Sequence, residues 1–306
     1  MPPGVLRLGT RGSALARAQS GLVARALEAR HPGLRVELVF ISTSGDRMQR
    51  GPVTAPAGLK GLFVKEIEES LAGGDVDVGV HSMKDLPAHL APGLVLGSVP
   101  ARADARDVLV GGPPGGIRAL GAGSRVGTSS VRRRAQILSL RRDLDVVPLR
   151  GNVDTRLGRL ERGELDAIVL AAAGLARLGL APPSMQPIPA DEVLPAVGQG
   201  MLALECRADD AHTRELLVGI SDPPAEATAA AERGFLAAIG GDCNTPLAAH
   251  ASVAGGRLTL RALVIDPEGR ERVEDARSGP VADAARLGRE VAEGLLASGA
   301  GRLLGR

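Results

Sequence analysis

The sequence has almost no aromatic side chains. Among its 306 residues the only ones are Phe40, Phe63 and Phe235, with no tryptophan or tyrosine. Proteins that bind single-stranded nucleic acid usually stack the bases on aromatic side chains in a basic groove. Because the formal net charge is also only +2, the composition argues against a nucleic-acid-binding protein, and we expect no such partner.

Cysteine and long apolar runs are scarce as well. Cys206 and Cys243 are the only cysteines and lie far apart in the sequence, which is typical of reduced thiols in a cytoplasmic protein. The first residues lack the apolar segment of a secretory signal. No apolar run approaches the ~20 residues that cross a bilayer. We therefore expect a cytoplasmic protein with no membrane partner.

Two common binding motifs are missing. The histidines are scattered, and no spacing of histidine, cysteine and carboxylate residues indicates a metal site. The glycine-rich run at 111–116 lacks the Lys-Ser/Thr ending of a phosphate-binding loop. We expect neither a metal nor a nucleotide loop of that type.

Short apolar strands alternate with helices through the first 200 residues. Val5 to Leu8 is followed by Ser13, which can cap a helix from Ala14 to about Arg30, and Arg35 to Ile41 is the next strand. This alternation favours an α/β fold with parallel sheets and helices on their faces.

The pattern changes from Pro223 onward. One helix is followed by strand candidates separated by turns at 255–256 and 266–269, and then by a terminal helix. This order predicts a small α+β domain with an antiparallel sheet. The segment Leu194 to Gly200 could return the chain to the first domain as part of a hinge. We expect three domains, at residues 1–100 with 201–218, 101–200, and 219–306.

Arginine follows the ends of several predicted strands. Arg132 and Arg133 lie in the first turn of a helix that begins after Ser130, where the helix dipole disfavours cations. A bound anion would resolve this conflict, although an arginine-rich surface helix would give the same pattern. Similar positions are occupied by Arg11, Arg150, Arg156 and Arg177. Their recurrence indicates a cleft that gathers several carboxylates or phosphates.

Lys84 and Asp85 follow the strand candidate that ends near Val80. Ligands of open parallel sheets bind beyond the carboxyl ends of the strands. These two side chains are therefore candidates for a site, and the alternative is a surface ion pair near a turn.

Cys243 lies in the loop Gly240 to Pro246, between a mainly apolar helix and a proline. The paired glycines end the helix and Pro246 prevents a new one from starting at once. The thiol is thus expected on a turn. The loop alone does not distinguish a reactive thiol from a small buried apolar side chain.

Several motifs together resemble those of the porphobilinogen deaminase (hydroxymethylbilane synthase) family. They occur in the family's order and cover nearly the whole chain. The matching segments are Thr10–Ser13, Lys60–Glu66, Val80–Asp85, Gly127–Arg133, Leu149–Arg156, Leu194–Gln199 and the Cys243 loop.

The resemblance implies two α/β domains like those of periplasmic binding proteins, with a cleft and hinge, and a small third domain. It implies a transferase of tetrapyrrole and haem biosynthesis. Four porphobilinogen molecules would be joined head to tail with release of ammonia, and hydroxymethylbilane would then be freed by hydrolysis. The chain would grow on a dipyrromethane cofactor attached to Cys243 by a thioether. A monomer is expected.

The resemblance also assigns roles to individual residues. Asp85 would be the catalytic aspartate, and Lys84 beside it would help to keep it ionised. Because each pyrrole unit carries an acetate and a propionate, arginines suit its carboxylates. The cofactor would be held by Lys84, Ser130, Arg132, Arg133, Arg150 and Arg156. The substrate would be bound by Arg11, Ser13, Arg150, Arg156 and Arg177, with Gln199 at the hinge or cleft.

A loop at about residues 42–60 would cover the cleft, with Asp46, Lys60 and Phe63 at its ends. Many family members have a second lysine in this loop, where the present sequence has Ala55-Pro56-Ala57. The alternative function is a non-catalytic, two-lobed anion-binding or sensor protein of the same fold, since a fold does not define an activity.

Overall fold

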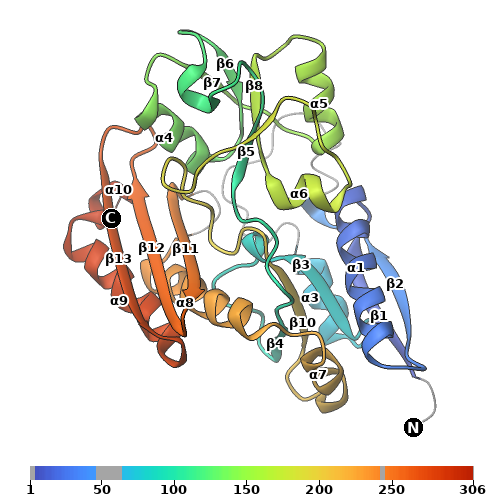
Figure 1. The fold of residues 1–306 in the computed structure, drawn as a ribbon. Helices are drawn as coiled ribbons and strands as arrows, with labels where there is room; N and C mark the ends of the chain where they lie inside the picture. Colours follow the sequence, from blue (N-terminus) through green and yellow to red (C-terminus); the bar gives the residue numbers. More distant parts are fainter. Residues whose placement is uncertain (1–3, 46–63, 242–244, 306) are drawn as a thin grey trace. The chain divides into compact units, whose positions relative to one another are not determined.

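The computed structural model describes residues 4–45, 64–241 and 245–305, and Figure 1 shows its fold. The chain divides into two compact units, Met1–Arg102 with Met201–Ala229 and Ala103–Gly200 with Ala230–Arg306. The chain therefore passes between the units after residues 102, 200 and 229. The expected division into three domains stays a prediction.

The first unit contains a five-stranded sheet in the order β2-β1-β3-β10-β4. Its strands are β1 (Val5–Arg11), β2 (Arg35–Ile41), β3 (Val78–Ser82), β4 (Leu94–Ser98) and β10 (Leu202–Arg207). The sheet packs with α1 (Ala14–Arg30), α3 (Lys65–Ala72) and α7 (Ala211–Val218), as Figure 1 shows for α1 beside β1 and β2. Leu8 and Val78 of the sheet and Leu27 of α1 are fully buried in its core.

The second unit contains another five-stranded sheet, in the order β7-β6-β8-β5-β9. Its strands are β5 (Asp107–Gly111), β6 (Arg125–Gly127), β7 (Asp145–Val147), β8 (Ala167–Ala171) and β9 (Met185–Pro187). The helices of this region are α4 (Val131–Leu140), α5 (Val153–Glu161) and α6 (Ala172–Arg177), with a short 3₁₀ turn at Gly116–Ala119. Each of these helices follows a strand, so each begins close to a strand end.

The expectation of parallel sheets was wrong in one respect, because both sheets are mixed. β1 is parallel to β2 and β3, but β10 is antiparallel to β3 and β4. Likewise β6 is parallel to β7 and β8, whereas β5 is antiparallel to β8 and β9. The antiparallel strands β5 and β10 are the ones that follow a passage of the chain between units. They are not entered from the crossover helices that impose parallel pairing.

The part of the chain from Pro223 onward has the expected α+β composition. A three-stranded antiparallel sheet joins β11 (Leu247–Ala254), β12 (Arg257–Ile265) and β13 (Arg272–Pro280). Around it are α8 (Pro223–Ile239), α9 (Ala284–Ala297) and α10 (Ala300–Leu303), with a 3₁₀ turn at Val281–Asp283. Figure 1 shows α9 beside β12 and β13. The α/β class and the C-terminal antiparallel sheet are confirmed.

Two glycines let α8 and α9 approach closely. A Cβ atom on Gly234 would lie 2.6 Å from the carbonyl oxygen of Ala285, and one on Gly288 would overlap the carbonyl oxygen of Ala231. These neighbours are backbone atoms in helices, so they cannot move aside as a flexible side chain would. The crossing therefore requires the absence of a side chain at both positions.

Gly288→Ala is expected to lower the free energy of unfolding by about 1–3 kcal/mol, because the added methyl group overpacks the crossing. Thermal unfolding monitored by circular dichroism measures the effect. Gly301→Ala is the matched control, since Gly301 lies in α10 with no atom within 4 Å of the added Cβ. Equal stability of Gly288→Ala and the wild type would contradict this account.

Candidate functional site

The N-terminus of α4 lies directly after strand β6. Ser130 caps this helix by accepting a hydrogen bond from the backbone N–H of Arg133 at 3.4 Å. No acidic residue lies in the first turn, which contains Arg132 and Arg133. The local sequence thus builds a helix start whose dipole and side chains are both positive.

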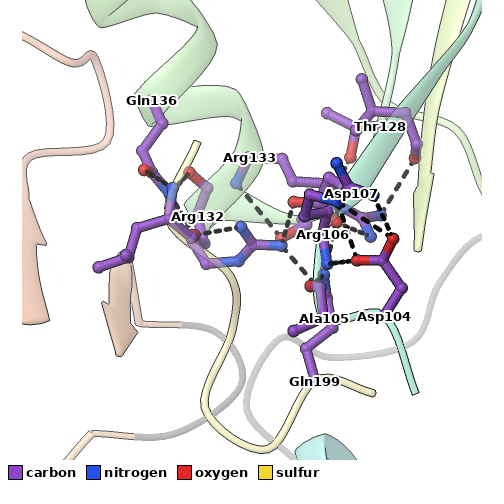
Figure 2. A network of polar contacts seen from close by, with 12 residues as sticks. Asp104, Ala105, Arg106, Asp107, Thr128, Arg132, Arg133, Gln136 and Gln199 are labelled. Atoms are coloured by element: carbon purple, nitrogen blue, oxygen red, sulfur yellow. Dashed lines mark hydrogen bonds and ion pairs between the residues drawn. The ribbon is translucent and has the colours of Figure 1, made fainter. Parts of the chain in front are cut away.

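Both arginines turn into the protein and share one carboxylate. Arg132 and Arg133 are only 4% and 6% exposed, and Asp107 at the start of β5 is fully buried. Asp107 Oδ2 accepts from Arg132 at 2.8 Å, and Oδ1 accepts from Arg133 Nη2 at 2.7 Å and Nε at 3.0 Å. Figure 2 shows the carboxylate lying between the two guanidinium groups. Backbone carbonyl oxygens of Leu194 and Val169 accept further bonds from Arg132 and Arg133, respectively.

This arrangement differs from the expectation for a helix start with paired arginines. The sequence predicted that a bound anion would offset their charge, yet an internal carboxylate already offsets part of it. Burial alone would raise the pKa of Asp107, but the charges of Arg132 and Arg133 outweigh it and hold that pKa far below the ordinary value. Burial lowers the pKa of Arg132. Two cations against one carboxylate leave a surplus positive charge in the interior.

Gln199 completes the network from the segment between Leu194 and Gly200. Its side-chain amide donates to the carbonyl of Ala105 at 2.6 Å and to Asp107 Oδ1 at 2.8 Å. The same segment is held at Gly198, whose N–H donates to buried Glu232 of α8 at 2.6 Å. Sequence analysis placed Gln199 at a hinge or cleft. Here its side chain packs against the carboxylate that holds both arginines.

Arg156 and Arg177 are further cations of the second unit with reduced exposure. The side chain of Arg156, in the first turns of α5, donates to the carbonyl of Gly151 at 2.9 Å. The side chain of Arg177, at the end of α6, donates to the carbonyl of Gly200 at 2.6 Å. Burial lowers the pKa of each to about 10, and the charge of Arg133 contributes for Arg156. By contrast, Arg150 is exposed at the residue before Gly151.

The first unit holds the other predicted site residues. Arg11 is the last residue of β1, and Ser13 caps α1 by accepting from the N–H of Ala16 at 3.2 Å. Lys84 and Asp85 lie in a single 3₁₀ turn, Met83–Asp85, directly after β3. The carboxylate-bearing residue Asp85 is exposed, and Lys84 is half-buried. Arg11 and Ser13 therefore lie at the end of β1, and Lys84 and Asp85 lie at the end of β3. Ligands of such sheets bind beyond the carboxyl ends of the strands.

A buried ionisable pair between β3 and its neighbour β10, close to this turn, was missed by sequence reasoning. His81 of β3 and Glu205 of β10 are 5% and 0% exposed, and His81 Nε2 lies 3.1 Å from Glu205 Oε2. Neither His81 Nε2 nor the two carboxylate oxygens of Glu205 have a hydrogen-bond partner among the described residues. Burial, and then the charge of Glu205, raise the pKa of the nearby Glu68 of α3. Only strand pairing brings these residues together, so no spacing in the sequence signals them.

The predicted residues thus fall into three groups. In the second unit, Arg132, Arg133 and Gln199 share one network, with Arg156 within electrostatic reach of it. In the same unit Ser130 caps α4, Arg177 bonds to Gly200 and Arg150 is exposed. Arg11, Ser13, Lys84 and Asp85 lie in the other unit. Cys243, Asp46, Lys60 and Phe63 lie outside the described residues.

Comparison with known proteins identifies the family. Residues 6–215 match the porphobilinogen deaminase, dipyromethane cofactor binding domain, and residues 227–297 match the porphobilinogen deaminase, C-terminal domain. The chain belongs to the porphobilinogen deaminase family.

Curated relatives agree over the full length. Porphobilinogen deaminase of Syntrophotalea carbinolica is 49% identical over 99% of this chain and 96% of its own. That of Roseiflexus castenholzii is 48% identical over 98% of each chain. A solved periplasmic binding protein of Salmonella typhimurium matches 71% of this chain and 91% of its own, at 15% identity and a TM-score of 0.42. This likeness is too distant to serve as evidence for the fold.

The family assignment makes the chain a transferase with a dipyrromethane cofactor binding domain. The residues of the second unit fit such a group, which carries several carboxylates. Arg132 Nε is buried and has no hydrogen-bond partner among the described residues. Arg156 and Arg177 are desolvated cations that form no ion pair within the described chain, where only backbone carbonyls accept from them. Carboxylates would supply the missing acceptors.

Two other features bear on the class of protein. No helix among the described residues is long and apolar enough to cross a membrane. Within the same residues, no group of three histidine, cysteine or acidic side chains is placed to hold a metal ion.

The described thiol, Cys206 of β10, is fully buried in the first unit. Burial raises its pKa to about 11, so at pH 8 the reactive thiolate is a trace species. We expect iodoacetamide to label Cys206 in the native protein at least ~100-fold more slowly than in urea, because the pKa shift depletes the thiolate by about that factor. Mass spectrometry of tryptic peptides measures both rates. Equal rates with and without urea would show that Cys206 is accessible.

Proposed function

We propose that this protein joins four porphobilinogen molecules head to tail on a covalent dipyrromethane primer held by Cys243. Each addition releases one ammonia, and hydrolysis frees hydroxymethylbilane. The surplus of buried positive charge in the second unit supports this most directly. A growing pyrrole chain gains two carboxylates with every unit, and desolvated arginines are suited to bind them. A non-catalytic anion-binding protein would have no need for Cys243 as the attachment point of a primer.

We assign the binding of primer and substrate carboxylates to side chains at strand ends. Lys84, Ser130, Arg132, Arg133, Arg150 and Arg156 would hold the primer, and Arg11, Ser13, Arg150, Arg156 and Arg177 the substrate. When bound, the dipyrromethane supplies the pyrrole carbon to which an incoming unit is joined. The arginines orient the carboxylates of both partners, so the reacting carbons are kept in register.

We assign to Asp85 the catalytic role of stabilising positive charge on the substrate and moving a proton. Loss of ammonia from porphobilinogen leaves a positive charge delocalised over the pyrrole ring and its nitrogen. An exposed carboxylate at the end of β3 can accept a hydrogen bond from the pyrrole N–H and stabilise this charge as it develops. It can then take part in moving the proton that the ring carbon loses when the new bond forms. We propose that Asp46, Lys60 and Phe63 would act in a loop at about residues 42–60 that would cover the site.

We infer three domains, at residues 1–100 with 201–218, 101–200 and 219–306. We also infer that the protein is a monomer that acts in the cytoplasm and binds no nucleic acid. The unpaired thiol of Cys206 suits a reducing compartment. Sedimentation of the purified protein measures its oligomeric state.

The intact mass of the purified protein is expected to exceed the sequence mass by two linked pyrrole units. Peptide mapping should place the excess on Cys243, because this is the thiol assigned to the thioether. Cys243→Ser should have no excess mass and no turnover. The unmodified Cys206 peptide provides an internal control. Active wild-type protein with an unmodified mass would refute the covalent primer.

Asp85→Asn is expected to fold and to retain the covalent primer. Its turnover should fall about 10²–10⁴-fold, the usual contribution of a group that transfers protons in the transition state. Ammonia release with porphobilinogen measures the rate. Asp75→Asn is the matched control, since Asp75 is also an exposed aspartate but precedes β3 instead of following it. Turnover of Asp85→Asn within a few-fold of the control would remove Asp85 from the chemistry.

A further inference from the structure

Asp107 is a fully buried carboxylate whose two oxygens are both engaged. Oδ1 accepts from Arg133 and Gln199, and Oδ2 accepts from Arg132 at 2.8 Å. Its backbone is also fixed, because the N–H of Ile188 donates to the Asp107 carbonyl at 2.8 Å and the residue pairs with Ala171 in the sheet. The carboxylate is therefore held rigidly by β5.

We propose that Asp107, oriented by Gln199, is a positioning residue that sets the guanidinium groups of Arg132 and Arg133 in place for the carboxylates of the primer. This inference rests on the proposed function, in which those arginines hold the primer. Asp107 itself contacts no substrate. Its effect is transmitted through the two side chains that it holds (Figure 2).

The geometry supports positioning because each guanidinium is fixed from two sides. Arg132 Nη2 bonds to Asp107 while its Nη1 donates to the Leu194 carbonyl at 2.7 Å. Arg133 Nη2 and Nε bond to Asp107 while its Nη1 donates to the Val169 carbonyl at 3.1 Å. A planar group held at both ends cannot rotate, so its remaining N–H bonds point in fixed directions.

Charge supports the same conclusion. Arg132, Arg133 and Asp107 together have a net charge of one positive unit, and Arg156 lies near enough for its charge to be felt with that of Arg133. Without Asp107, the two buried arginines would repel each other and Arg156 with no internal compensation. They would then swing toward solvent or bind an anion in another orientation. Asp107 thus leaves the cluster with a net positive charge that attracts a carboxylate. At the same time it holds the two guanidinium groups close together.

Gln199 gives the carboxylate its orientation. Its amide nitrogen bonds to both Asp107 and the Ala105 carbonyl, which leaves Oε1 3.4 Å from Arg132 Nη2. A carboxylate at position 199 would place one oxygen next to the same guanidinium, but it would lose the bond that the amide donates to the Ala105 carbonyl. The negative charge can therefore be moved from position 107 to position 199 while it stays beside Arg132.

The test uses Asp107→Asn, Gln199→Glu and the double variant Asp107→Asn/Gln199→Glu in the full-length protein. Asp104→Asn is the matched control. Asp104 lies three residues from Asp107 and is also paired to an arginine, Arg106 at 2.7 Å, but it is exposed and contacts neither Arg132 nor Arg133. Two readouts are taken: the fraction of protein with the covalent mass excess, and kcat and KM per loaded molecule.

Asp107→Asn is expected to lower primer loading and to reduce kcat about 10- to 100-fold. Losses of this size are typical when a residue that orients a ligand-binding side chain is removed, as is known for metal sites. KM for porphobilinogen should change little, since the affected arginines are assigned to the primer. The double variant should recover part of the loss, because the new carboxylate restores the charge but cannot donate to the Ala105 carbonyl. Asp104→Asn should match the wild type. Wild-type loading and kcat in folded Asp107→Asn would overturn the proposal.

Two further measurements keep the outcomes separate. If Asp107→Asn does not fold, Gln199→Leu leaves the ion pairs but removes the orienting amide. It should load primer with a lower kcat, and wild-type kcat would overturn the role of Gln199. If wild-type protein shows neither mass excess nor ammonia release, the proposed function fails. In that case the ¹⁵N–¹H resonances of Arg132 and Arg133 Nε still test positioning, which predicts that they broaden in Asp107→Asn but not in Asp104→Asn.

Discussion

One buried carboxylate permits two arginines to lie inside the second unit. A guanidinium group without a counter-charge is costly to bury, and Arg132 and Arg133 are both nearly inaccessible to solvent. Asp107 bonds to both of them and Gln199 orients it. The start of α4 and the path of residues 194–200 depend on this arrangement, because Arg132 and Gln136 of α4 also bond to the Leu194 backbone.

The compensation is incomplete, and that imbalance suits the family's chemistry. Arg156 and Arg177 remain partly buried with backbone carbonyls as their acceptors, and one donor of Arg132 has no partner among the described residues. A protein selected for stability alone would replace such groups with apolar ones. Their presence is understandable if a ligand with several carboxylates completes the electrostatics when it binds.

Much of the local structure could be predicted from the sequence, because its causes are local. The hydroxyl group of Ser13 before a helix predicted the cap of α1, and this cap is confirmed. The strand-end positions of Arg11, Lys84 and Asp85 followed from the alternation of strands and helices. The family resemblance rested on several motifs in order, and full-length relatives confirm it.

Features that depend on distant pairing could not be predicted. Asp107 is the first residue of an apolar strand, and nothing near it in sequence indicates two arginine partners 25 and 26 residues away. The pair of His81 and Glu205 depends on β3 lying beside β10. The mixed direction of both sheets depends on where the chain passes between units, which alternation of elements does not encode.

The separation of Gln199 from Asp107, 92 positions along the chain, has a consequence for synthesis on the ribosome. β5, α4 and β8 are all made before residues 194–200 emerge. Until then Asp107 lacks its orienting amide, and Arg132 lacks the Leu194 carbonyl. The second unit therefore cannot complete its interior charge network while its own sheet strands are being translated. Its final packing must wait for the segment that leads the chain back to the first unit.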